Sequence, residues 1–115
     1  MLEIFSGNAP KIWDADFCFP ENSLHPDEQV KMAEEIVKKA KDKNITVITY
    51  SPVMVEAFNV YSKKHNVDFQ AYYCDDFIGE ETFKVHRTDL WIIYQNLGKA
   101  FETISLLDIQ LEFKL

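Results

Sequence analysis

The chain has 115 residues, of which 47% are hydrophobic, and its formal net charge is −7. This length and apolar content predict one domain over residues 1–115, built around a single core. The acidic balance argues against nucleic-acid binding by the chain itself, because such binding depends on clustered Lys and Arg side chains. No apolar run approaches the ~20 residues of a membrane span, and the opening segment lacks the pattern of a signal peptide. We therefore expect a cytoplasmic protein with no membrane contact.

The first predicted elements are a strand, a loop and a helix. Lys11–Phe19 is rich in aromatic and apolar residues and stops at a proline, which predicts a strand. The loop PENSLHP follows. Pro26 is suited to the first turn of a helix, and the acidic residues after it favour the positive end of the helix dipole. We expect this helix to run to about Lys43, because lysines fill its last turn.

The middle of the chain predicts a second strand and a second helix. The run ITVITY, Ile45–Tyr50, is short and β-prone, as expected of a buried strand. Ser51 is a favourable N-cap for a helix whose first residue is Pro52. Apolar residues recur at helical spacing along that segment, which predicts a helix ending near His65.

The last third of the chain predicts a hairpin followed by a helix. Phe69–Cys74 is β-prone and Thr82–Arg87 alternates, so these two segments can pair as a hairpin. Thr88 is a candidate cap for a helix that begins at Asp89. The end of the chain, Leu106–Leu115, fits either more helix or a closing strand, and both alternatives stay open.

Strands that alternate with helices are typical of an α/β fold. We predict a three-layer-type α/β fragment with a mainly parallel sheet and flanking helices. The two cysteines, Cys18 and Cys74, are far apart and lack metal-type spacing, so they are expected to be reduced side chains without a redox role.

Two motifs carry a resemblance to a known family. The segment PENSLHP, at 20–26, and the later run ITVITYSPVMVEAF resemble the C-terminal half of ABC-type P-loop ATPases. The resemblance is particularly to stand-alone bacterial and phage-type members near the SMC, RecF and OLD groups. In that family a strand ending in Asp-Glu, the Walker B motif, precedes Pro-Glu-Asn-x-Leu-His-Pro, and Thr-His-Ser-Pro opens a later helix. The run DLWIIYQNLGKAF also resembles a recurrent tail of such ATPases, so the resemblance covers Ile12 to Phe113.

The sequence departs from this family at the positions that carry catalysis. The resemblance places the family's magnesium-holding Asp at Cys18, its catalytic Glu at Phe19 and its switch His at Tyr50. The phosphate-binding pattern Gly-x-x-x-x-Gly-Lys-Ser/Thr does not occur in the sequence. Phosphoryl transfer requires a phosphate loop, a metal and a group that orients water, and a thiol is a poor ligand for Mg²⁺. We therefore expect no enzymatic activity, no cofactor and no metal.

The resemblance also points to a candidate interface. Its residues form the loop segment that the sequence keeps while the adjacent acids are replaced: Glu21, Asn22, Ser23, Leu24, His25 and Pro26. In the family, His25 would lie by the loop that meets a partner subunit. The alternative is a histidine that forms only local hydrogen bonds at a helix start. Asp14 and Asp16 could form part of a metal site. Two acids at alternate positions are more often exposed side chains on a strand, and we favour that interpretation.

These observations predict a non-catalytic protein-interaction module derived from an ATPase half-domain. It would associate with itself or bind an ABC-type ATPase as a decoy, inhibitor or accessory subunit. The alternative is a split ATPase, in which another chain supplies the phosphate-binding loop. A half-domain would expose a sheet edge, and we expect either Leu2–Phe5 or a partner to pair with that edge.

Overall fold

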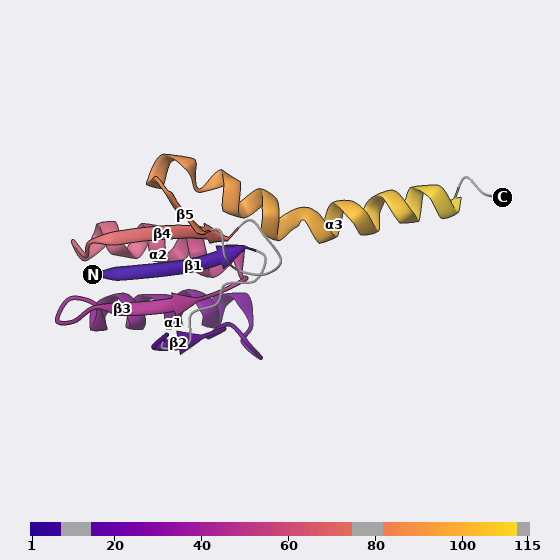
Figure 1. Cartoon of the computed structure of the whole chain (residues 1–115). Coiled ribbons are helices and arrows are strands. Elements are labelled where there is room, and N and C mark those ends of the chain that lie inside the picture. Colours follow the sequence, from indigo (N-terminus) through magenta and orange to yellow (C-terminus); the bar gives the residue numbers. More distant parts are fainter. Residues whose placement is uncertain (8–14, 75–81, 113–115) are drawn as a thin grey trace.

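The computed structural model describes residues 1–7, 15–74 and 82–112, with the side chains of 99–103 excepted, and places them in an α/β fold (Figure 1). The sheet has five strands in the order β2-β3-β1-β4-β5. The strands are β1 (Leu2–Gly7), β2 (Phe17–Cys18), β3 (Ile45–Ile48), β4 (Phe69–Cys74) and β5 (Thr82–Val85). The helices are α1 (Pro26–Lys39), α2 (Pro52–Lys64) and α3 (Trp91–Glu112), with a short 3-10 turn over Arg87–Asp89.

The first strand occupies the middle of the sheet. β1 pairs in parallel with β3 on one side and with β4 on the other. Leu2 and Ile4 are fully buried, as expected of a strand with a neighbour on each side and helices over one face. Of the two alternatives given above, Leu2–Phe5 pair with the sheet, but they form its centre and not a cover for its edge.

The sheet is mixed but mostly parallel. β2 joins β3 in parallel, whereas β4 and β5 form the predicted antiparallel hairpin. The predicted strand Lys11–Phe19 is much shorter in the described residues, where β2 covers only Phe17–Cys18; residues 11–14 lie outside them. Just before β2, the carboxylate of Asp16 accepts the backbone N–H of Thr46 at 2.8 Å.

The helices cover one face of the sheet. α1 and α2 pack side by side, and the first turns of α3 lie beside α2, toward β4 and β5 (Figure 1). The core between sheet and helices includes Phe58 and Ile93, both fully buried. On the opposite face Phe5 stacks on Tyr72, with ring centroids 4.5 Å apart. The described part therefore has two layers, and the three-layer arrangement predicted from the sequence is not seen in it.

Of two N-caps predicted from the sequence, one is confirmed and the other is wrong. Ser51 caps α2 as expected, because its Oγ accepts the N–H of Met54 at 3.1 Å. Thr88 is not the cap that the sequence suggested. Instead His86 Nδ1 accepts the N–H of Thr88, which opens the 3-10 turn before α3. The chain end, which the sequence left undecided, is helical as far as Glu112.

Gly7 is required where the central strand ends. Its φ is +114°, and a Cβ at this position would lie 2.4 Å from the carbonyl oxygen of Cys74 on β4. Only glycine combines this backbone conformation with so close an approach to a neighbouring strand. The parallel pairing of β1 with β4 therefore depends on the absence of a Cβ atom at Gly7.

We predict that Gly7→Ala lowers the free energy of unfolding by roughly 2 kcal/mol or more, because strain and backbone contact add. Gly98 in α3 is the matched control, since a Cβ there would meet no atom within 4 Å. Gly98→Ala should raise stability by up to about 1 kcal/mol through helix propensity. Urea denaturation of both variants measures the difference, and equal effects would contradict the role given to Gly7.

Candidate functional site

The loop after β2 turns sharply at the carboxyl edge of the sheet. Phe19 adopts a φ of +52° and Ser23 a φ of +65°, which are uncommon for residues other than glycine. The N–H of Phe19 still bonds to the carbonyl of Ile48 at 2.8 Å, so the turn begins directly at the sheet. Further backbone bonds, from Asn22 to Phe19 and from Leu24 to Glu21, close the loop on itself. Backbone hydrogen bonds within the loop and to β3 therefore hold this loop in place.

Glu21 holds the loop to the end of β3. One carboxylate oxygen accepts the hydroxyl of Thr49 at 2.7 Å, and the other accepts the N–H of Tyr50 at 2.9 Å. Thr49 is fully buried, so its hydroxyl needs a partner inside the protein. Hydrogen bonds to an ionised carboxylate are stronger than those between neutral groups. The Glu of the PEN segment therefore has a structural role in this chain.

A second set of contacts connects the loop to both helices. Ser51 Oγ donates to Gln29 Oε1 at 2.5 Å, and Gln29 Nε2 donates to the carbonyl of Leu24 at 3.1 Å. Because Ser51 also caps α2, the start of α2, the first turns of α1 and the loop share one hydrogen-bond network. The network gives the carboxyl edge a fixed shape.

An aromatic pair occupies two of the three substituted positions. The rings of Phe19 and Tyr50 lie 4.8 Å apart at an angle of 50°, while Cys18 is exposed at the end of β2. Partial burial, with smaller effects of Cys74 and Glu21, raises the pKa of Tyr50 above its usual value near 10. Tyr50 therefore stays neutral near pH 7. Neither ring can hold a metal or accept a proton from water, so the pair offers contact surface.

The rest of the candidate interface is mostly exposed. Asn22, Ser23, His25 and Pro26 face solvent, and Leu24 is half-buried. His25 Nδ1 accepts the N–H of Asp27 at 3.2 Å and so caps α1, which is the local role weighed for it from the sequence. A partner-binding role for this segment stays a prediction.

No metal cluster is found within residues 1–7, 15–74 and 82–112. Asp16, one of the two acids considered as ligands, is bonded to the edge of β3 through both its carboxylate and its backbone N–H. Asp14 lies outside the described residues.

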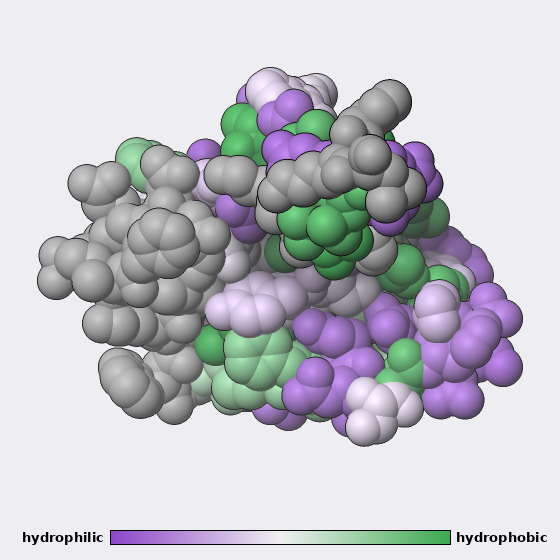
Figure 2. Space-filling view, turned by 90° about the vertical axis from the view of Figure 1, so that its right-hand side faces the viewer, coloured by the Kyte–Doolittle hydropathy of each residue, from purple (hydrophilic) through white to green (hydrophobic). Residues whose placement is uncertain are grey.

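The second half of α3 projects past the carboxyl ends of the strands (Figure 1). Figure 2 views this end of the molecule and shows apolar surface, in green, around the helix. We call residues 104–112 the tail. Its five large apolar side chains are all at least 49% exposed: Ile104, Leu106, Leu107, Ile109 and Leu111.

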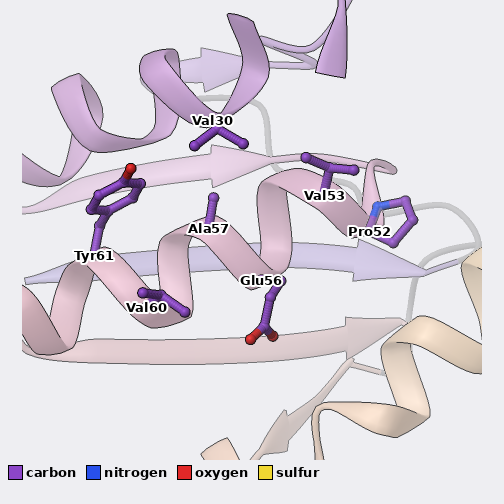
Figure 3. Close-up of a pocket in the computed structure, with 7 residues that line it drawn as sticks. All are labelled: Val30, Pro52, Val53, Glu56, Ala57, Val60 and Tyr61. Atoms are coloured by element: carbon purple, nitrogen blue, oxygen red, sulfur yellow. The ribbon is translucent and has the colours of Figure 1, made fainter. Parts of the chain in front are cut away.

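An open apolar groove runs along the outer face of α2 (Figure 3). Its volume is about 530 Å³, and one residue of α1 and six of α2 line it: Val30, Pro52, Val53, Glu56, Ala57, Val60 and Tyr61. Val53 and Val60 are 36% and 48% exposed. We call this hollow the α2 groove. No sequence pattern predicts this groove, because it depends on how α1 packs against α2.

Comparisons with known proteins add no identity. No family model, no curated protein and no solved structure matches the chain. Within the described residues, no helix is both long and apolar enough to cross a membrane.

We predict that Glu21→Gln lowers the free energy of unfolding by about 1–3 kcal/mol. The carboxylate accepts a hydrogen bond at each oxygen, whereas the amide of Gln has one oxygen and an NH₂ group that can only donate, so either the hydroxyl of Thr49 or the N–H of Tyr50 loses its acceptor. Asn22→Ala, in the same loop but exposed, is the matched control and should change stability by no more than about 0.5 kcal/mol. Chemical denaturation monitored by tryptophan fluorescence compares the two variants. A silent Glu21→Gln would contradict the structural role of this carboxylate.

Proposed function

We propose that this chain is a non-catalytic protein-interaction module, derived from the C-terminal half of an ABC-type ATPase, that binds a protein through the tail of α3. The observation that carries the proposal is the tail itself, a terminal helix that bears five exposed large apolar side chains. A solvent-exposed helix normally places such residues on the side that faces the core. Their exposure marks a surface that a partner covers.

The chemistry of the carboxyl edge supports a role without catalysis. Phe19 and Tyr50 stand where the resemblance expects a catalytic Glu and a switch His, and their rings are packed against each other. Glu21, the carboxylate beside them, is engaged by Thr49 and Tyr50. Among the described residues, no group of three or more His, Cys, Asp or Glu side chains is arranged to hold a metal ion. The split-ATPase alternative is less well supported for the same reason.

The resemblance and the tail together suggest two kinds of partner. The tail can meet a second copy of this chain, or it can meet an ABC-type ATPase whose own C-terminal half this chain imitates. In both cases the partner is a protein, and hydrophobic burial supplies the main driving force. A decoy, an inhibitor or an accessory subunit would each use such a surface.

Affinity capture from a native cell lysate tests the proposal. We predict that the tagged chain enriches a specific protein, or untagged copies of itself, and that Leu107→Asp removes this enrichment, because a carboxylate cannot be buried without a partner. Met32→Asp is the matched control; it puts the same charged side chain in place of an exposed apolar residue on α1, outside the tail. Equal recovery by all three baits would overturn the proposal.

A second test addresses catalysis. We predict that the triple variant Cys18→Asp, Phe19→Glu and Tyr50→His hydrolyses no ATP above background, because the chain still lacks a phosphate-binding loop. Phosphate release at saturating Mg-ATP measures this outcome. Turnover by the triple variant alone would show that this chain carries a phosphate site of its own and would favour the enzymatic alternative.

A further inference from the structure

One apolar stripe continues along α3 from the core into the tail. Leu90, the residue just before α3, and Ile93, in its first turn, are 3% and 0% exposed, because they pack inside the domain. Ile104, Leu107 and Leu111 lie at whole seven-residue repeats from those two residues, so they fall on the same side of the helix. We call these three residues the tail stripe. They are 54% to 63% exposed, so a surface that is buried in the first half of the helix is left open in the second.

The α2 groove has the shape and chemistry to receive such a stripe. Ala57 lies between Val53 and Val60 along α2 in the lining of the groove (Figure 3). Its small side chain lets a second helix approach closely. The groove runs from Pro52 to Tyr61, about 14 Å at 1.5 Å per residue. The tail stripe, from its first residue to its last, spans about 11 Å. The two surfaces therefore match in length.

We propose that the tail stripe of one copy lies in the α2 groove of a second copy, and reciprocally, so that the chain forms a two-fold dimer. This inference rests on the proposed function and names its partner. It requires that the tail of one copy can enter the groove of the other and that the two surfaces carry complementary charges. It also requires that the contact buries enough surface area for a stable dimer.

The directions of the helices allow this entry. Arg87 reaches Ser62 near the end of α2, and the hydroxyl of Tyr94 donates to Glu56 nearer its start, so α3 runs antiparallel to α2. The tail therefore leaves the molecule past Pro52, at the edge where the groove opens. Two copies with these edges facing each other, and their helices on the same side, point each tail toward the other's groove.

The lateral positions of tail and groove differ, so a two-fold axis has to carry one onto the other. α3 lies on the β4–β5 side of α2 (Figure 1), whereas the groove lies over the outer face of α2, bordered by Val30 of α1 and by Glu56, which Tyr94 of α3 contacts (Figure 3). Half a turn about an axis placed midway between tail and groove exchanges the two positions. The tail of one copy is then brought over the groove of its partner, and the same holds in reverse.

The charges of the two surfaces are complementary at the inner end of the groove. The last turn of α2 carries Lys63 and Lys64. From residue 100 to 112, α3 carries Glu102, Asp108 and Glu112 and no basic residue. A tail that enters at Pro52 brings Glu112 and the negative end of its helix dipole toward those lysines.

The two-fold dimer contains two tail-groove contacts, which together bury more surface area than one contact can. A stable interface buries roughly 1,200–2,000 Å², which is more than a tail of two turns and a shallow groove provide. The two-fold arrangement covers two tails and two grooves at once and brings the carboxyl edges together. Tyr50, 43% exposed at that edge, lies where the two copies would meet.

Sedimentation velocity of the purified full chain gives the first test. We predict a dimer whose dissociation constant rises roughly tenfold or more in Leu107→Asp and in Val60→Asp. Two matched controls carry the same change elsewhere: Leu106→Asp on the opposite side of the tail, and Met32→Asp on α1 outside the groove. These should shift the constant by no more than about threefold. A monomeric wild type, or equal effects of all four changes, would overturn the proposal.

Thiol cross-linking distinguishes this dimer from a pairing of two tails. In a Cys18→Ser background, which leaves only the buried Cys74, one tagged chain carries Leu107→Cys and another carries Val60→Cys. A bis-maleimide should join the two chains when they are mixed and should leave Leu107→Cys alone uncoupled. Coupling of Leu107→Cys to itself, or none in the mixture, would overturn the tail-in-groove arrangement. Capture of a different protein that still depends on Leu107 would leave the proposed function intact while this inference fails.

Discussion

The position of β1 is the constraint on which the rest of the molecule depends. A strand paired in parallel on both sides can only be completed by neighbours that return across the sheet, and here α1 and α2 make those returns. Both helices consequently cover the same face, where Leu2 and Ile4 lie at the centre of the core. Gly7 then permits close contact with β4 at the strand's end.

The carboxyl edge concentrates the features that bear on function. In parallel sheets this edge is where ligands commonly bind. In this chain the described part of the edge carries a loop fixed by Glu21, an aromatic pair and the base of the projecting tail. Polar groups that could serve catalysis are engaged in holding the loop. The protein-binding role proposed for this chain would use the same edge that supports chemistry in nucleotide-binding folds.

Much of the fold follows from local sequence, and the rest depends on pairing at a distance. Ser51 and Pro52 predict the start of α2 because capping is a local interaction. The central position of β1 was not predicted, because its six residues are ordinary alone and gain their place from β3 and β4. The tail was ambiguous because apolar residues at 104, 106, 109 and 111 nearly alternate, which also fits a strand. The bonds of Glu21 could not be foreseen, since Thr49 lies 28 residues away.

The exposed tail also has a consequence for the chain inside a cell. A copy without a partner presents a terminal helix with a line of apolar side chains, the kind of feature that chaperones and proteases recognise. In the dimer proposed above, the partner would hide this helix, and its occupation would rise with concentration. The lifetime of the chain would then depend on its concentration, and copies without a partner would be the first to be removed.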